Sequence, residues 1–159
     1  GFCTFNGLAV AVHVAAQRGL RALVLDVDAH CGGGTASLLP AGTQQVDVSV
    51  SGFDSYRPGD DTWLRMADSH DYDDAIAEAL AHIDTLEGFD VVLYNAGMDP
   101  ANCGVSIEQL RRREAMVAGH EFGCPVVFTL AGGYTWGSTS MDEVVDLHRI
   151  TIETFAMAA

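Results

Sequence analysis

The sequence predicts an α/β fold in three layers, with a parallel sheet between helices on both faces. Four short apolar or alternating runs indicate strands, and segments with apolar residues at helical spacing lie between them. Strands that alternate with helices are typical of a parallel sheet. The 159 residues suffice for one hydrophobic core, and the sequence contains no linker or internal repeat. We therefore expect a single domain over residues 1–159.

Four strands are predicted in order along the chain. Residues 22–27 are apolar and lean towards β-branched side chains, which indicates a buried parallel strand. Residues 45–51 alternate between polar and apolar side chains, as a second strand would. Residues 89–94 are apolar on both faces and should lie centrally, and residues 125–130 form the fourth strand. The polar segment at 52–70 is expected to be a long loop.

Helices are predicted where apolar residues recur every three or four positions. These segments are residues 4–17, 71–87, 106–120 and 141–159, with a short helix at 35–39. Asn6 and Gly7 weaken the first turn of the first helix, and Gly19 marks its end. The run from Arg111 to Arg113 is most simply a solvated face of its helix.

The charge balance excludes some classes of partner. The chain has 22 acidic and 8 basic residues, a net charge of −14, and all the basic residues are arginines. Nucleic-acid binding requires a basic patch, so we expect no nucleic-acid partner. The acidic surface would favour cationic substrates, or it is an adaptation for solubility or for a high-salt environment. No apolar run suggests a membrane span, and no secretory signal is recognised. Four scattered cysteines are expected to be free thiols in a cytoplasmic protein.

The segment after the first predicted strand carries three side chains that can bind a metal ion. Asp26, Asp28 and His30 alternate, so in an extended segment they would share one face. Two carboxylates and an imidazole suit zinc, whereas carboxylates with carbonyl oxygens also suit harder cations. The spacing therefore favours a metal site, although a carboxylate that caps the next loop would produce the same pattern.

Two further strand ends carry groups that would meet this segment at one edge of a parallel sheet. Asp99 follows the third strand, and Tyr134 follows the fourth on a turn of two glycines. Asp28, His30 and Asp99 would then form a three-ligand zinc site with an open position. Tyr134 would donate its hydroxyl to a developing oxyanion, unless it is a turn aromatic that caps the core.

Four segments resemble the histone deacetylase family, including bacterial deacetylase-like and acetylpolyamine amidohydrolase relatives. They are Gly1-Phe2-Cys3 with Phe5-Asn6, Asp26-Val27-Asp28-Ala29-His30 with Gly32 and Gly34-Thr35, Ala96-Gly97-Met98-Asp99-Pro100, and Leu130-Ala131-Gly132-Gly133-Tyr134. They occur in the family's order. The resemblance implies the C-terminal part of a deacetylase catalytic domain, with a truncated arginase/deacetylase-like fold. It also implies a zinc-dependent amide hydrolase for acetyl-lysine or acetylpolyamine substrates.

The resemblance further implies roles for single residues. Asp28, His30 and Asp99 are the implied ligands of zinc or another divalent ion, and Tyr134 is the implied donor to the substrate carbonyl. A K⁺ or Na⁺ site is implied at Asp26, Asp28, His30, Ser49 and the backbone of Val50. Phe2, Gly132 and Gly133 are the implied substrate-binding residues.

The chain also departs from the family pattern. The family's two adjacent acid/base histidines precede the Gly-Phe-Cys segment, and the sequence begins at Gly1. Cys31 stands where a second histidine is usual, and Gly33 stands where an Asp or Asn usually orients one histidine of the pair. We therefore expect impaired catalysis, since loss of a general acid/base costs about 10²–10⁴ in rate. His70 and His120 are the remaining candidates for proton transfer.

Two other interpretations stay open. In the first, the chain is a non-catalytic, metal-binding or oligomerising remnant of the same fold. A truncated sheet would expose an edge and a core face, and such surfaces drive the formation of homo-oligomers. Alternatively, Asp26 and Asp28 serve a magnesium-dependent phosphatase. That chemistry commonly uses a lysine near the phosphate, and the sequence contains no lysine.

Overall fold

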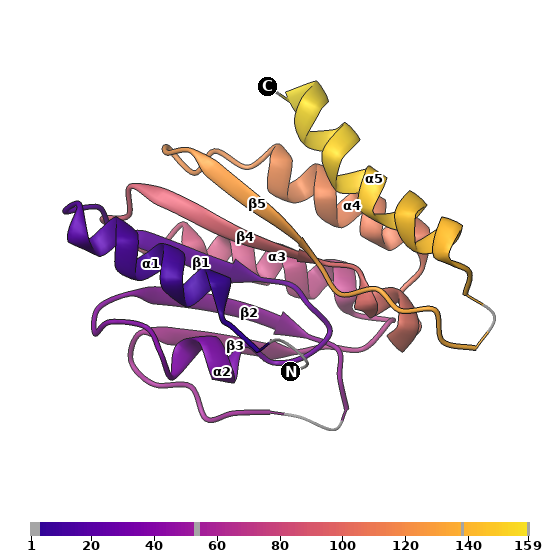
Figure 1. Ribbon diagram of the computed structural model, residues 1–159, viewed down its shortest axis with the longest axis horizontal. Helices are drawn as coiled ribbons and strands as arrows, with labels where there is room; N and C mark the ends of the chain where they lie inside the picture. Colours follow the sequence, from indigo (N-terminus) through magenta and orange to yellow (C-terminus); the bar gives the residue numbers. More distant parts are fainter. Residues whose placement is uncertain (1–3, 53–54, 138, 159) are drawn as a thin grey trace.

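The computed structural model describes residues 4–52, 55–137 and 139–158. Its five strands form one all-parallel sheet in the order β3-β2-β1-β4-β5 (Figure 1). The strands are β1 (Ala22–Asp26), β2 (Gln44–Ser49), β3 (Thr62–Met66), β4 (Val91–Gly97) and β5 (Val126–Ala131). This sheet confirms the predicted α/β class.

Helices cover both faces of the sheet, as the three-layer prediction requires (Figure 1). The helices are α1 (Gly7–Gln17), α2 (Gly33–Ala36), α3 (Tyr72–Ile83), η1 (Asp99–Cys103), α4 (Ile107–Ala118) and α5 (Met141–Ala158). Helices α1 and α2 lie on one face, and α3, α4 and α5 lie on the other. None of the described helices is long and apolar enough to cross a membrane.

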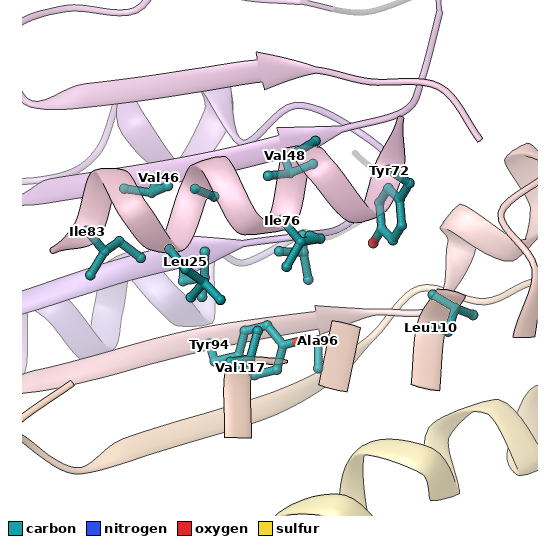
Figure 2. Close-up of a cluster of buried hydrophobic side chains, with 14 of the residues drawn as sticks. Leu25, Val46, Val48, Tyr72, Ile76, Ile83, Tyr94, Ala96, Leu110 and Val117 are labelled. Atoms are coloured by element: carbon teal, nitrogen blue, oxygen red, sulfur yellow. The ribbon is translucent and has the colours of Figure 1, made fainter. Parts of the chain in front are cut away.

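The main hydrophobic core lies between the sheet and helices α3, α4 and α5 (Figure 2). Alternate residues of the strands point into it, including Leu25, Val46 and Tyr94, and they meet Ile76 of α3 and Val117 of α4. A smaller cluster lies under α1 and contains Val12, Ala22, Val24 and Leu93. Burial on both faces explains why β1 is apolar from Ala22 to Leu25.

Strand β3 was not predicted, because it lies inside the segment expected to be a loop. Thr62–Met66 is an edge strand whose residues are mostly half-buried, so it has no continuous apolar run. Arg65 in its middle pairs with Asp71 and Glu78 instead of joining the core. A short edge strand with a charged residue resembles a polar loop in sequence.

The arginine run of α4 is not uniformly solvated as predicted. The side chain of Arg112 is 55% exposed and pairs with Asp73, whereas Arg113 is 0% exposed. Helix α4 packs against both α3 and α5, so its inward face is enclosed. The expectation of a solvated face is therefore wrong for Arg113, whose buried partners are described below.

Candidate metal centre

The candidate site lies at the carboxyl ends of β1 and β4, which are hydrogen-bonded neighbours in the sheet. Asp26 is the last residue of β1, and Asp28 and His30 follow it in the next loop. Asp99 is the first residue of η1, directly after β4. Parallel strands end at the same edge of a sheet, so residues about 70 positions apart in the sequence lie together at this edge.

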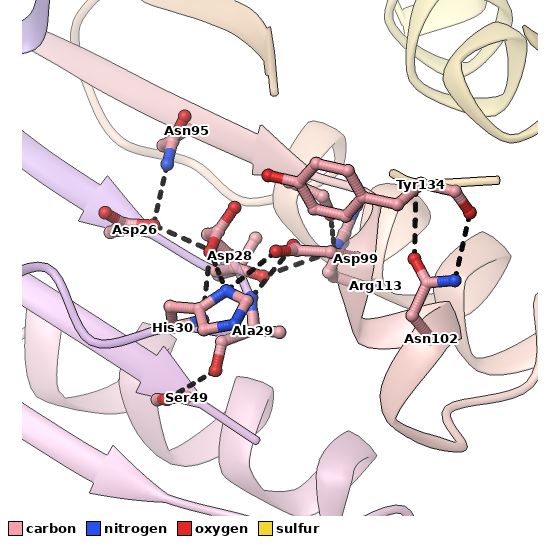
Figure 3. Close-up of polar contacts among 12 residues, drawn as sticks. Asp26, Asp28, Ala29, His30, Ser49, Asn95, Asp99, Asn102, Arg113 and Tyr134 are labelled. Carbon is pink, nitrogen blue, oxygen red and sulfur yellow. Dashed lines mark hydrogen bonds and ion pairs between the residues drawn. The ribbon is translucent and has the colours of Figure 1, made fainter. Parts of the chain in front are cut away.

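Asp28, His30 and Asp99 converge on one point (Figure 3). His30 Nδ1 lies 2.8 Å from Oδ2 of Asp99 and 3.2 Å from Oδ1 of Asp28. One ligand atom from each residue lies within 4.8 Å of the other two. Asp99 is 2% exposed, whereas Asp28 and His30 are partly accessible. We call these three residues the triad; the structure brings them together as predicted.

Backbone hydrogen bonds hold the triad in place. The N–H of His30 donates to Oδ1 of Asp28 at 2.9 Å, and the N–H of Asp28 donates to Oδ1 of Asp26 at 3.0 Å. The N–H of Ala29 donates to Oδ1 of Asp99 at 3.1 Å. These backbone donors orient the carboxylates of Asp26, Asp28 and Asp99.

The triad and its neighbour Asp26 concentrate negative charge. Burial, with the charges of Asp99 and Asp26, raises the pKa of Asp28 to about 7. Burial and the charge of Asp47 raise the pKa of Asp26 to about 7. Burial lowers the pKa of His30, but the carboxylates of Asp99 and Asp28 outweigh it and raise that pKa above its usual value. A cation at the triad would relieve this repulsion, and two carboxylates with one imidazole suit a divalent ion such as zinc.

Glycines allow the turn after β5 to approach the triad closely. A Cβ on Gly132 would lie 2.7 Å from Oδ1 of Asp99 and 3.1 Å from Oδ2 of Asp28. Gly132 and Gly133 also adopt positive φ angles of 59° and 83°. A side chain at Gly132 would therefore both strain the backbone and displace a triad carboxylate.

Tyr134 is held at this turn by a residue that the sequence analysis missed. Asn102 of η1 donates from Nδ2 to the carbonyl of Tyr134, and its Oδ1 accepts from the N–H of Tyr134, both at 3.1 Å (Figure 3). The ring of Trp136 stacks on that of Tyr134 with centroids 4.8 Å apart. Asn102 lies three residues after Asp99, so one short helix orients both a triad residue and Tyr134.

The residues predicted for a monovalent cation lie beside the triad. Oγ of Ser49 donates to the carbonyl of Ala29 at 2.6 Å, and the N–H of Val50 donates to the same carbonyl at 3.0 Å. Asp26 accepts from Nδ2 of Asn95 at 2.8 Å. Phe2, predicted to contact substrate, lies outside the described residues.

Asp47 on β2 carries a buried carboxylate that was not among the predicted site residues. Asp47 is the register partner of Asp26 on β1. It accepts hydrogen bonds from the Tyr56 hydroxyl at 2.6 Å and from Nε2 of Gln45 at 2.9 Å. These hydrogen bonds favour a lower pKa for Asp47, but burial outweighs them and raises its pKa to about 6. In the sequence, Asp47 had appeared only as a polar position of an alternating strand.

Of the histidines named as candidates for proton transfer, His120 lies far from the triad, whereas His70 follows the carboxyl end of β3 at the same edge of the sheet as the triad. His120 pairs with Asp84 at 3.1 Å, where α4 ends and the chain leads into the start of β5, so it lies at the opposite end of the sheet. His70 is in the segment before α3. His148 of α5 does approach the site, since its Nε2 lies 3.1 Å from the carbonyl of Gly132.

Comparison with known proteins supports the family resemblance. Residues 1–63 match the family model of the histone deacetylase domain. An uncharacterized protein of Picosynechococcus sp. is 33% identical over 151 residues, which cover 84% of this chain and 50% of that protein. The chain thus spans about half the length of the curated relative it matches.

Solved structures of the family share the fold. An acetylpolyamine aminohydrolase from Burkholderia pseudomallei is 19% identical with a TM-score of 0.75, over 99% of this chain and 50% of that one. A histone deacetylase homologue from Aquifex aeolicus is 18% identical with a TM-score of 0.72, over 99% of this chain and 47% of that one. Residues 1–63 thus match the histone deacetylase family, and the sheet has the arginase/deacetylase-type fold of these solved homologues, of which the chain spans about half.

Proposed function

We propose that this domain is a zinc-dependent, deacetylase-like amide hydrolase for acetyl-lysine or acetylpolyamine substrates. The observation that carries the proposal is the convergence of Asp28, His30 and Asp99 within 4.8 Å at the edge where Tyr134 stands on its glycine turn. The family-model match and the shared fold support a deacetylase-like domain.

The chain's own residues take distinct roles in this proposal. Asp28, Nδ1 of His30 and Asp99 would hold the metal ion. Such an ion, when bound, polarises a carbonyl and makes a water molecule more acidic. The hydroxyl of Tyr134 donates a hydrogen bond to the substrate carbonyl oxygen as negative charge develops there. Asn102 positions Tyr134 through the paired hydrogen bonds at 3.1 Å.

We propose that this chain by itself turns substrate over slowly. Gly33 stands at the position that resembles the family's orienting Asp or Asn, and Cys31 stands where a second histidine is usual. A general acid/base contributes about 10²–10⁴ in rate. We also propose a site for K⁺ or Na⁺ at Asp26, Asp28, His30, Ser49 and the backbone of Val50.

A second candidate function is that of an assembling module, and strand β5 favours it. Val126–Ala131 ends the sheet in the described part of the chain and carries no charged residue. Val127 is 56% exposed although its register partner Leu93 is buried under α1. Uncharged edge strands promote pairing between chains, so we propose a homo-oligomer formed through β5.

Metal analysis tests the proposed hydrolase. We expect one zinc per wild-type chain and loss of that zinc in Asp28→Asn, whereas Asp74→Asn on the exposed side of α3 should retain it. Turnover of a fluorogenic acetyl-lysine peptide and of an N-acetylated polyamine should be zinc-dependent and should fall in Tyr134→Phe. An equal zinc content in the wild type and in Asp28→Asn would show that the triad is not the zinc site. Zinc binding without any turnover would favour the assembling module.

A further inference from the structure

Arg113 is a fully buried cation directly beneath the triad, and no role proposed so far uses it. It projects from α4 towards the carboxyl ends of β1 and β4 (Figure 3). Nη1 donates to the carbonyl of Gly97 at 2.7 Å and to that of Val27 at 3.4 Å. Because a buried guanidinium is costly unless it is fully paired, its presence at this point requires an explanation.

The two carbonyls belong to the two strands that deliver the triad. Gly97 is the last residue of β4 and precedes Asp99 by two positions. Val27 follows β1 and immediately precedes Asp28. A single nitrogen atom of Arg113 therefore bridges the points at which the two ligand-bearing segments leave the sheet. Beyond this level the N–H groups of Asp28 and Ala29 donate to the carboxylates of Asp26 and Asp99 and not to backbone carbonyls of β4, so the sheet ladder no longer sets the separation of the two segments.

Neighbouring buried groups hold the guanidinium in this orientation. Nε of Arg113 donates to Oε1 of Glu114 at 2.8 Å, and the same oxygen accepts from the hydroxyl of Tyr94 at 2.9 Å. Nη1 also donates to the hydroxyl of Tyr72 at 3.1 Å. Glu114 balances the charge locally, so Arg113 acts on the strand ends by hydrogen bonding and not as a net charge. A planar group with several fixed donors suits this arrangement better than a lysine.

We propose that Arg113 is a positioning residue that sets the separation between Asp28 and Asp99 by bridging the carbonyls of Val27 and Gly97. The proposal rests on the triad being a metal site, as proposed above, and it adds a determinant of metal affinity that touches neither the ion nor the substrate. Residues that hold ligands in place typically change metal affinity 10–100-fold when altered.

The test compares paired substitutions on α4. Arg113→Met together with Glu114→Gln removes the bridge and leaves no buried charge, whereas Arg112→Met removes a neighbouring surface arginine. Zinc affinity is measured by competition with a chromophoric chelator, and the visible absorption of bound Co²⁺ reports ligand geometry. We expect the double variant to bind zinc at least tenfold more weakly with an altered Co²⁺ spectrum. Arg112→Met should stay within twofold of wild type.

A milder variant covers the case in which the double variant fails to fold. Tyr72→Phe removes only the hydroxyl that contacts Nη1 of Arg113, and we expect a two- to fivefold loss of zinc affinity with the fold retained. If the double variant folds and keeps the wild-type zinc affinity and Co²⁺ spectrum, the bridging role is overturned. If the double variant does not fold, the same result for Tyr72→Phe would overturn it.

Amide hydrogen exchange separates this inference from the proposed function. If wild type bound no metal, the proposed hydrolase would fail, but the bridge would still be measurable in the metal-free chain. We expect faster exchange at residues 27–30 and 97–99 in the Arg113 variant, or in Tyr72→Phe, than in Arg112→Met. Equal exchange at both segments would overturn the bridge independently of any metal.

Discussion

Asp26 and Asp47 stand side by side on adjacent parallel strands, and both are buried. Burial raises the pKa of each, to about 7 for Asp26 and about 6 for Asp47. Asn95 donates to Asp26, and Tyr56 and Gln45 donate to Asp47, so hydrogen bonds offset part of the cost of burying these carboxylates. The pair lies next to the triad but is not part of it, and its raised pKa values make the stability of the chain depend on pH.

The first prediction concerns the stability of the metal-free chain. Between pH 4 and 7 the carboxyls of Asp26, Asp47 and Asp28 bind more protons in the folded than in the unfolded chain, because folding raises the pKa of each of them. The free energy of unfolding should therefore be highest at low pH within this range and fall as pH rises through about 6 and 7, by about 1–3 kcal/mol. Urea denaturation at pH 5 and pH 8 with a chelator measures this change.

Asp47→Asn provides the control for that measurement, since it removes one of the two buried charges. The variant should lose less stability than wild type between pH 5 and 8, whereas Asp74→Asn should behave like wild type. Stability that rises with pH in wild type, or an equal pH dependence in Asp47→Asn, would contradict the assignment of the effect to this pair.

The second prediction concerns the pH dependence of metal binding. The raised pKa of Asp28, about 7, means that a proton must leave this carboxyl before it can act as a ligand near neutral pH. Zinc affinity should therefore increase by about tenfold from pH 6 to pH 8, with the gain levelling off above pH 7 as the carboxyl becomes ionised. Titration calorimetry in two buffers of different ionisation enthalpy counts the released protons. Binding without proton release at pH 6 would show that Asp28 is already ionised.

The third prediction tests the close approach of the glycine turn. Gly132→Ala should weaken zinc binding at least tenfold, because its Cβ would lie 2.7 Å from Oδ1 of Asp99. Gly137→Ala is a matched control, since Gly137 has a similar φ of 64° but a Cβ there would meet nothing within 4 Å. Both variants pay the cost of a positive φ, about 1 kcal/mol, and only Gly132→Ala should disturb the triad. Equal zinc affinities would refute a packing role for Gly132.

Much of the fold and of the triad follows from local sequence signals. Asp28, His30 and Asp99 follow apolar runs, and the rule that parallel strands end at one edge suffices to bring them together. Arg113 could not be placed in the same way. Its burial depends on which face of α4 meets the sheet, and two neighbouring arginines made that face look solvated. The role of Asn102 could not be predicted either, because it depends on a hydrogen bond to Tyr134, which lies 32 residues further along the chain.

The fourth prediction concerns self-association through β5. The two edges of the sheet differ, because β3 carries Arg65 with its ion pairs, whereas β5 has no charged residue. In a chain with a net charge of −14, an uncharged edge is where two copies can approach with least repulsion. We expect concentration-dependent association in sedimentation velocity experiments, and it should strengthen with salt, which screens the repulsion.

Charge placed on this edge should abolish that association. Val127→Lys adds a charge beside the open edge, on the face where the apolar surface under α1 continues onto β5. Met157→Lys makes the same change at a side chain near the end of α5 that is even more exposed, so it controls for net charge. We expect Val127→Lys to be monomeric and Met157→Lys to associate like wild type. A monomeric wild type at high concentration and high salt, or equal association of both variants, would show that β5 is not the interface, and the assembling module would then lose the feature that favours it.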